Sequence, residues 1–201
     1  MLKILSPATF KPIPWKNGLG HTTELAINSG GNLDNFNWRL SIASVVNDGD
    51  FSNFSGYQRN LVLIEGEGII LDHRNGEIDK LTNLLDISHF DGGSNTYGSL
   101  VNGGIKDFNI MTNENSFTAE VNCYVKQHSA NIPLATNRII FAFSLNNEMN
   151  IEHGGKTIAS VPVGHLAQLQ TNDVSERDKQ DTTVISGQNM IIVKLLCLSA
   201  P

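Results

Sequence analysis

A period of two in the hydrophobic side chains constrains the fold of this chain more than any other feature. From Phe117 to Lys126, apolar and polar residues alternate, which is typical of a β-strand with one buried face. Short apolar runs at 60–64 and 68–72 lie on either side of Gly66, the pattern of a β-hairpin. No segment shows a sustained helical period. Many short strands separated by glycine turns predict an all-β sandwich or barrel.

The hairpin pattern occurs twice in the chain. Arg59 begins the first copy, and Arg138 begins the second copy 79 residues later. Each copy has two apolar runs that end before a glycine turn. The repeat predicts two similar β units, with residues 1–127 as the N-terminal unit and residues 128–201 as a degenerate C-terminal unit packed against it.

Composition limits the class of protein. A chain of 201 residues is long enough to bury a core without a metal or disulfide. The net charge of −6 argues against nucleic acid as a partner. No apolar run approaches the roughly 18 residues of a membrane-spanning helix, and no signal peptide is visible. We therefore expect a cytoplasmic protein without a membrane partner, in which Cys123 and Cys197 are free thiols.

Three segments carry more chemical variety than packing requires. Residues 14–24 read PWKNGLGHTTE, and this run combines an aromatic ring, a cation, an amide, glycines, hydroxyls and a carboxylate. Residues 38–43 read WRLSIA and lead to DGDFS at 48–52. Residues 107–111 read DFNIM. In this order, over roughly residues 9 to 112, the motifs resemble those of the HutD/Ves family.

The resemblance implies a fold and a context. It implies a double-stranded β-helix, the RmlC-like cupin jelly roll, with two cupin units in one chain and a small-molecule pocket. It links the chain to histidine utilisation without implying a reaction. Leu19, His21, Asp50 and Asn60 depart from the usual family residues, and two of them flank the glycine-rich loop.

A cupin-type fold raises the question of a metal. Most cupin enzymes bind a metal through a His-x-His pair, a later Glu and a distant His, a ligand set that suits first-row metals. No two of the six histidines are separated by one residue: His21, His73, His89, His128, His153 and His165. His165 directly follows Gly164, and we interpret that segment as a structural turn. The sequence predicts no metal and no other cofactor.

Polar residues at alternating strand positions predict a pocket. Arg39 and Ser41 share one strand face, and Asp107, Asn109 and Met111 share another. A buried arginine must be paired or must meet an anion, because an unpaired buried charge is costly. The candidate ligand-binding residues are Trp15, Lys16, Asn17, Arg39, Arg59, Asp107, Asn109 and Met111. A structural Arg39–Asp107 ion pair remains the alternative.

Three functions are compatible with these residues. The first is a metal-free bicupin that binds a small anionic metabolite, such as urocanate or formylglutamate, in a regulatory or sensing role. The second is a metal-free isomerase, epimerase or lyase that acts on a small carboxylate, with His21 and either Glu24 or Asp107 as acid and base. The third is an interaction protein that forms a homodimer through exposed strand edges.

Overall fold

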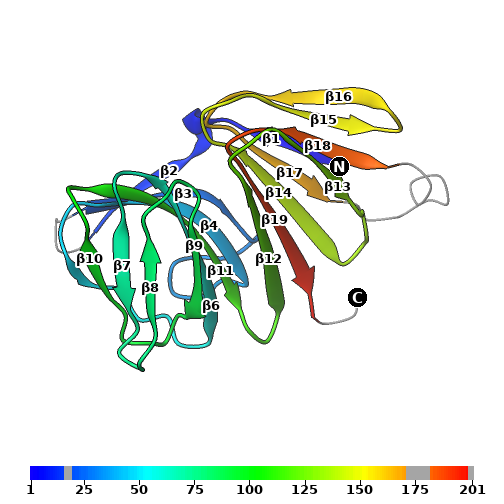
Figure 1. The fold of residues 1–201 in the computed structure, drawn as a ribbon. Helices are drawn as coiled ribbons and strands as arrows, with labels where there is room; N and C mark the ends of the chain where they lie inside the picture. Colours follow the sequence, from blue (N-terminus) through cyan, green and yellow to red (C-terminus); the bar gives the residue numbers. More distant parts are fainter. Residues whose placement is uncertain (16–19, 171–181, 199–201) are drawn as a thin grey trace. The chain divides into compact units, whose positions relative to one another are not determined.

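The computed structural model describes residues 1–15, 20–170 and 182–198. Within these ranges the chain is built from β-strands and one short 3-10 helix, η1 (Pro7–Thr9), without an α-helix (Figure 1). Contacts divide the strands between two compact units. We call Phe10–Thr118 the N-terminal unit, and Met1–Thr9 together with Ala119–Pro201 the C-terminal unit. The all-β prediction is confirmed.

The N-terminal unit contains two antiparallel sheets. Its six-stranded sheet has, in spatial order, β2 (Lys11–Pro14), β3 (Gly20–Ile27), β4 (Trp38–Val45), β11 (Ile105–Asn113), β6 (Tyr57–Glu65) and β9 (Ile87–Asp91). Its four-stranded sheet has β5 (Gly49–Asp50), β10 (Tyr97–Leu100), β7 (Ile69–Asp72) and β8 (Ile78–Leu81). Strands β3, β4 and β11, which carry residues of the three motifs, are therefore neighbours, and β6 lies on the other side of β11.

The C-terminal unit also contains two antiparallel sheets. The five-stranded sheet has β1 (Leu2–Leu5), β17 (Leu166–Gln170), β14 (Arg138–Ser144), β19 (Met190–Cys197) and β12 (Phe117–Tyr124). The four-stranded sheet has β13 (His128–Ile132), β18 (Thr183–Gly187), β15 (Met149–His153) and β16 (Lys156–Val161).

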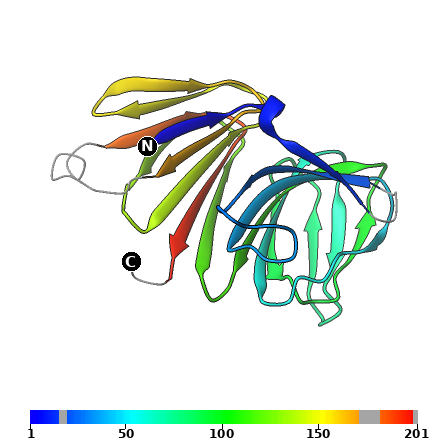
Figure 2. The ribbon, with the colours of Figure 1, turned by 180° about the vertical axis from the view of Figure 1, so that it is seen from behind.

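The division of the chain differs from the expected boundary at 127/128. Strand β1, next to the N-terminus, pairs with β17 (Figure 2). Leu2 lies opposite Leu169. The first nine residues therefore belong to the C-terminal unit, and the contacts change from one unit to the other between Thr118 and Ala119. The polar stretch around Pro133 lies inside the C-terminal unit, beyond β13.

The two units share one strand order. The series β4-β11-β6-β9 corresponds to β12-β19-β14-β17, and β5-β10-β7-β8 corresponds to β13-β18-β15-β16. Arg59 on β6 and Arg138 on β14 occupy matching strands, as the sequence repeat predicts. Each unit is a two-sheet jelly roll, and the predicted double-stranded β-helix is confirmed.

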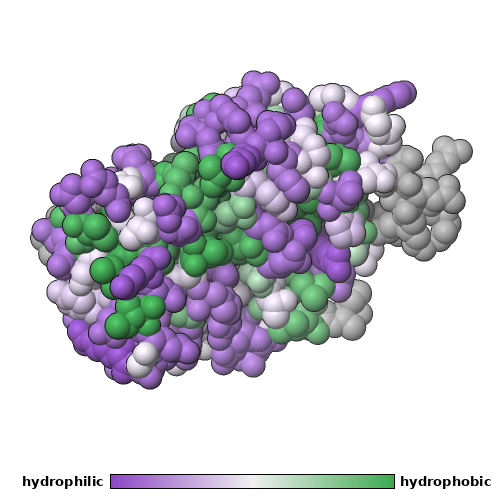
Figure 3. Space-filling view, viewed as in Figure 1, coloured by the Kyte–Doolittle hydropathy of each residue, from purple (hydrophilic) through white to green (hydrophobic). Residues whose placement is uncertain are grey.

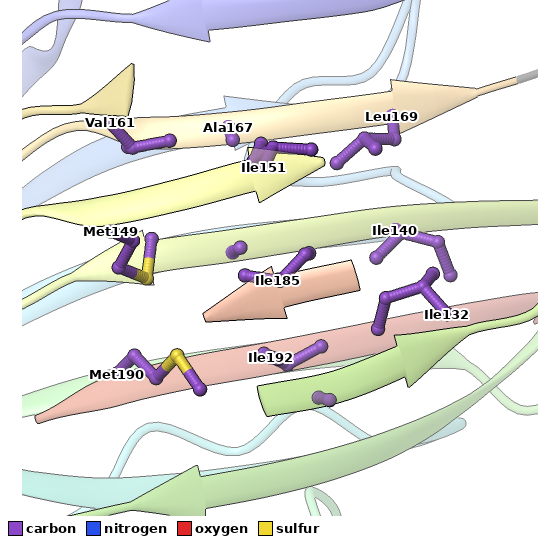
Figure 4. Packing of buried hydrophobic residues seen from close by; sticks show 12 residues of the cluster. Ile132, Ile140, Met149, Ile151, Val161, Ala167, Leu169, Ile185, Met190 and Ile192 are labelled. Atoms are coloured by element: carbon purple, nitrogen blue, oxygen red, sulfur yellow. The ribbon is translucent and has the colours of Figure 1, made fainter. Parts of the chain in front are cut away.

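The interior of the C-terminal unit is largely apolar, with Ser144 and Thr183 as buried polar residues. Figure 4 shows its side chains interlocked between the two sheets. The buried members of this cluster are Ala130, Ile132, Ile140, Ala142, Met149, Ile151, Val161, Ala167, Leu169, Ile185, Met190 and Ile192. Burial of apolar surface at this density is a sufficient driving force for folding.

The N-terminal unit has a smaller apolar cluster. Its members lie on β4, β6, β7, β8, β9 and β11: Ala43, Val45, Leu61, Leu63, Ile69, Leu71, Leu81, Phe90 and Ile105. Polar and charged side chains are buried beside them, among them Glu24, Arg39, Arg59, Asp107 and Asn109. Buried charges require partners, so this half of the interior is the region where a functional site is expected.

Figure 3 shows a face with many hydrophilic side chains and several groups of adjoining hydrophobic ones. Ile78 on β8 and Ile87 on β9 are 57% and 43% exposed, and both strands are sheet edges. Scattered exposed apolar residues are normal on soluble domains. No helix in the described ranges has the length and apolar character needed to cross a membrane.

Candidate functional site

The N-terminal unit contains a cavity of about 820 Å³ that is partly open to solvent. Its walls come from β2, β3, β4, β6 and β11 and from the segments around residues 33–34 and 47–54. The lining residues are Ile13, Pro14, Trp15, Thr22, Leu33, Asp34, Arg39, Ser41, Ala43, Val45, Asn47, Asp48, Gly49, Asp50, Phe51, Ser52, Phe54, Arg59, Gly98, Asp107, Asn109 and Met111. A cavity of this size accommodates a small metabolite.

Strand register brings the motif residues together. Met111 on β11 lies opposite Arg39 on β4 and opposite Arg59 on β6. Asn109 lies opposite Ser41 on β4. The period of two then places Asp107 on the same face as Asn109 and Met111, and all three line the cavity.

Six of the eight predicted ligand-binding residues line this cavity: Trp15, Arg39, Arg59, Asp107, Asn109 and Met111. Lys16 and Asn17 lie outside the described residues. The sequence therefore located the interior of the N-terminal unit correctly, while ligand binding by these residues stays a prediction.

Arg39 is paired with Glu24. The Nε of Arg39 donates a hydrogen bond of 2.9 Å to Oε2 of Glu24, and both side chains are buried. The alternative of an Arg39–Asp107 ion pair is wrong, because the guanidinium faces a carboxylate on β3 instead. In the part of the chain that the structure describes, Nη1 and Nη2 of Arg39 have no hydrogen-bond partner. The outer edge of this guanidinium is therefore available to a ligand in the cavity.

A second chain of contacts joins Arg59 to Asp107 through Asn109. Nη2 of Arg59 donates to Oδ1 of Asn109 at 2.9 Å, and Nδ2 of Asn109 donates to Oδ1 of Asp107. Nη1 of Arg59 makes a long contact of 3.5 Å with the carbonyl oxygen of Ser52. Nε of Arg59 and Oδ2 of Asp107 have no hydrogen-bond partner among the described residues. The amide thus separates a cation from a carboxyl group that would otherwise pair directly.

Three aromatic rings surround the Arg59 guanidinium. Its Cζ lies 5.2 Å from the ring centroid of Phe51, 5.8 Å from that of Phe54 and 5.1 Å from that of Phe90. Each ring presents its electron-rich face to the cation, which stabilises a charge that has little access to water. Arg59 is held in place more tightly than Arg39, and we expect its role to be partly structural.

Burial shifts the acid–base behaviour of this cluster. Desolvation raises the pKa of Asp107 to about 7, against the opposing effects of the Arg59 charge and the Asn109 hydrogen bond. Desolvation also lowers the pKa of Arg59 to about 10, where Asp107 acts to raise it and Arg39 to lower it. Near neutral pH, Arg59 is therefore charged while Asp107 is divided between its two protonation states.

Trp15 forms part of the cavity wall. Its Nε1 donates to Oγ1 of Thr22 at 2.8 Å. Its ring lies against Gly20, where a Cβ atom would be 2.9 Å from two ring carbons and 2.7 Å from the carbonyl oxygen of Ser44. Gly20 is thus required for the close approach of the Trp15 ring to β3, which explains the glycine at this position of the motif.

His21 is not part of the site. It is exposed, and its Nε2 lies 3.4 Å from Oγ of Ser44. Its neighbour Thr22 lines the cavity, so the period of two directs His21 to the opposite face of β3. The proposal of His21 as a catalytic partner of Glu24 or Asp107 is therefore wrong.

The sequence did not reveal the aromatic rings around Arg59. Phe51 lies in the DGDFS motif at 48–52, Phe54 lies in a loop, and Phe90 lies on an edge strand. In the sequence, these three residues have in common only that each is a phenylalanine near polar turn residues. That signal does not identify a cation partner.

A second polar cluster lies next to the ring of Phe90. Nδ1 of the buried His73 contacts Oγ1 of Thr96 at 2.9 Å, and Nε2 contacts Oδ2 of Asp79 at 3.2 Å. Ser88 on β9 also donates to Asp79 on β8. The His73 ring lies 4.8 Å from that of Phe90. These contacts join the edges of two sheets and support the ring that covers Arg59.

The donor set favours an anion over a metal ion. Two guanidinium groups, Arg39 and Arg59, repel a cation, and no three His, Cys, Asp or Glu side chains of the described residues gather into a metal-binding group. A reactive thiol is also missing from the lining. Cys123 and Cys197 form no disulfide within the described residues, and burial raises the pKa of the Cys123 thiol to about 12. A thiol with such a pKa is a poor nucleophile at neutral pH.

Comparison with known proteins assigns the chain to a family. The HutD family model matches residues 7–192. The chain belongs to the HutD family. An uncharacterized 21.2 kDa protein from the hutC 3′ region of Pseudomonas putida is 29% identical over 174 residues, which cover 86% of this chain and 88% of the relative. The resemblance stated from the motifs is confirmed.

Two further proteins extend the comparison. Protein Ves of Escherichia fergusonii is 37% identical over 108 residues, which cover 53% of this chain and 56% of that protein. The structure of HutD from Pseudomonas fluorescens SBW25 superposes with a TM-score of 0.78 and 24% identity, covering 99% of this chain and 100% of that one. This structural similarity shows a shared fold.

Proposed function

We propose that the N-terminal unit binds a small anionic metabolite in its cavity, without a metal, and serves a regulatory or sensing role. The observation that carries this proposal is the state of Arg39. Its guanidinium is buried at the cavity wall, is held by one hydrogen bond to Glu24, and has two terminal nitrogens without a partner among the described residues. A charged group in this position is stabilised when an anion binds to it.

A carboxylate is the anion that this geometry suits best. The two terminal nitrogens of an arginine can donate to the two oxygens of one carboxylate. Apolar walls from Trp15, Phe51 and Met111 would enclose the rest of a small ligand. The name of the Pseudomonas putida relative places that protein beside hutC, so histidine-degradation intermediates such as urocanate and formylglutamate are the first ligands to test.

One observation favours an enzyme as a second candidate. Asp107 lines the cavity and has a pKa near neutrality, as expected of a general acid or base. Isomerases, epimerases and lyases usually need two such groups within reach of one substrate. Glu24 is occupied by Arg39, and His21 lies on the outer face of its strand. The binding function is therefore the better supported of the two.

The test compares two arginines. Isothermal titration calorimetry with urocanate and with formylglutamate would be performed on wild type, Arg39→Met and Arg138→Met, where Arg138 lies on β14 of the C-terminal unit and does not line the cavity. A charge-assisted contact contributes about 1.5–3 kcal/mol, so Arg39→Met should weaken binding about ten- to a hundredfold while Arg138→Met leaves it unchanged. Equal affinities in all three proteins would refute the assignment.

The same samples separate the binder from the enzyme. Each ligand would be incubated with a stoichiometric amount of protein and followed by proton NMR over several hours. We expect the ligand spectrum to stay unchanged apart from effects of binding. Appearance of a product in wild type but not in Asp107→Asn would establish the enzymatic alternative.

A further inference from the structure

The interior of the N-terminal cavity holds four buried ionisable side chains in two different arrangements. Arg39 and Glu24 form a direct ion pair at 2.9 Å. Arg59 and Asp107 are joined only through the amide of Asn109, and the structure shows no direct ion pair between them within the described part of the chain. The first pair is neutral as a unit. Because Arg59 is positively charged, the protonation state of Asp107 decides the net charge of these four side chains.

Asp107 has an incomplete set of partners. The side chain is fully buried, its Oδ1 accepts one hydrogen bond from Asn109, and its Oδ2 has no partner among the described residues. A buried carboxylate normally needs several donors to offset the loss of water. Asp107 has one, together with the more distant charge of Arg59, so its anionic and neutral forms have similar free energies.

Binding of a ligand carboxylate disturbs this balance. A negative group held by Arg39 lies in the same cavity as Asp107, because both residues line it. The two negative charges repel each other in a medium of low dielectric constant, and they share the field of Arg59. Two carboxylates that share a site do not both remain ionised.

We propose that Asp107 takes up a proton when the N-terminal cavity binds a carboxylate, so that the ligand anion and a proton bind together. This inference rests on the proposed function, since it concerns the same cavity. With Asp107 neutral, the buried groups Arg39, Arg59 and Glu24 carry one net positive charge, which matches one buried carboxylate. The proton moves from solvent to a carboxylate oxygen of Asp107, and no covalent bond of the ligand changes.

The other acidic groups around Asp107 also favour its protonation. Glu24 on β3 and the exposed carboxylates at the cavity lining add negative charge. Among the described residues, only Asp50 of these exposed carboxylates has a cationic partner, Arg74 at 2.9 Å. His73 and Asp79 lie behind Phe90 and contact each other. The exposed acidic lining residues are Asp34, Asp48 and Asp50. The positive charges that oppose protonation of Asp107 are Arg39 and Arg59.

The direction of the pH dependence follows from linkage. If the complex binds one proton more than the free protein, affinity is highest below the pKa of free Asp107 and falls as pH rises above it. The pKa of Asp107 is about 7 in the free protein. The affinity for a carboxylate that does not itself titrate should therefore fall about tenfold between pH 6 and pH 8.

The test uses two probes, sodium formate and formylglutamate, whose carboxylates stay ionised throughout this range. Affinities would be measured by NMR titration at pH 6, 7 and 8 on wild type, Asp107→Asn and the control Glu120→Gln, which removes an exposed carboxylate outside the cavity. The affinity of wild type and of Glu120→Gln should fall about tenfold between pH 6 and pH 8. Asp107→Asn should bind equally well at all three values. On wild type alone, the carboxyl 13C resonance of Asp107 at pH 7 should shift toward the protonated position when the probe is added.

The outcomes separate this inference from the function on which it rests. Binding of either probe with an affinity independent of pH, or an Asp107 resonance that does not move, would overturn proton uptake and leave the binding function intact. If neither probe binds to wild type or to Asp107→Asn at any pH, the binding function fails, and proton uptake fails with it. Should Asp107→Asn not fold, the wild-type resonance decides the question.

Discussion

The two jelly-roll units share a strand order but differ in what fills them. In the N-terminal unit, Asp107 on β11 lies opposite Leu63 on β6. In the C-terminal unit, Ile192 on β19 lies opposite Ala142 on β14. Leu63 and Ala142 correspond through the 79-residue repeat, so an isoleucine occupies the place of the buried carboxyl group. One scaffold thus supports either a closed apolar core or a polar cavity.

The difference shows how a site is added to a stable fold. The C-terminal unit fills its interior from both sheets with apolar side chains (Figure 4). The N-terminal unit uses only part of its interior in this way, with Leu61, Leu63, Ile69 and Leu71 fully buried. The remaining strand positions face the cavity and are free to carry charge. Function is therefore located in the residues that the packing of the fold does not require.

The largest expected effect comes from placing a buried carboxylate in the C-terminal unit. Ile192→Asp would bury a charge among Ile140, Ala142 and Met190, none of which can donate a side-chain hydrogen bond. We expect a loss of about 4 kcal/mol or more, or failure to fold, because an unpaired buried charge is among the most damaging substitutions. Urea denaturation measures the loss.

Ile192→Val serves as the control for Ile192→Asp. It removes one methylene group without adding polarity and should cost about 1 kcal/mol. Similar losses in both variants would show that the C-terminal interior tolerates polar groups as the N-terminal one does, and the contrast between the units would then be unfounded.

The next effect is a gain of stability in Asp107→Asn that depends on pH. The pKa of Asp107 is raised to about 7 in the folded protein, above its unfolded value of about 3.9. Folded wild type therefore binds more protons than the unfolded chain between these values and loses stability as pH rises, by at most about 1.4 kcal/mol per unit. The asparagine variant does not carry this penalty.

Urea denaturation across pH measures this difference. The stability of Asp107→Asn relative to wild type should be lowest near pH 4, should rise up to pH 7, and should stay constant above that value. A difference that is the same at pH 4 and pH 8 would mean that Asp107 is ionised in the folded protein over the whole range.

A smaller effect concerns the aromatic rings around Arg59. Phe90→Leu removes the ring that lies 5.1 Å from the guanidinium and 4.8 Å from the His73 ring. We expect a loss of about 1–2 kcal/mol, composed of lost packing and a lost cation–π contact. A double-mutant cycle with Arg59→Met separates the two contributions. A coupling free energy of zero would show that the ring contributes packing alone.

Local patterns explain which features could be predicted from the sequence. The period of two in a β-strand places Asp107, Asn109 and Met111 on one face, independently of the rest of the chain. The internal repeat identifies corresponding strands because both copies have a similar pattern of apolar residues. These signals identified the strands, the two units and six lining residues of the cavity. They depend only on residues that are close together in the chain.

Non-local pairing explains what the sequence could not reveal. Arg39 meets Glu24 because β3 lies beside β4 with an irregular register between Glu24 and Ala26. The pairing of β1 with β17 joins residues at opposite ends of the chain. Neither the register of β3 nor the partner of β1 leaves a mark on local composition. The sequence therefore named Arg39, Arg59 and Asp107 but did not reveal Glu24 as the partner of Arg39.

The smallest expected effect comes from the ion pair of the C-terminal unit. Lys194 lies opposite Ile140 on β14, as Asn109 lies opposite Leu61 on β6. Its Nζ contacts Oε1 of Glu120 at 2.7 Å, but the Glu120 side chain is 61% exposed. Exposed pairs contribute about 0–1 kcal/mol, so Glu120→Gln should change the free energy of unfolding by less than about 0.5 kcal/mol.

Glu24→Gln is the matched change in the N-terminal unit, and the two variants together test whether burial separates the units. Loss of the Glu24 carboxylate leaves the Arg39 guanidinium buried without a counter-charge, which should cost about 3 kcal/mol. High salt should barely alter that loss, because buried charges are poorly screened. A cost for Glu120→Gln equal to that for Glu24→Gln would mean that both units hold their charges in similar surroundings, and the distinction between a closed core and a charged cavity would fail.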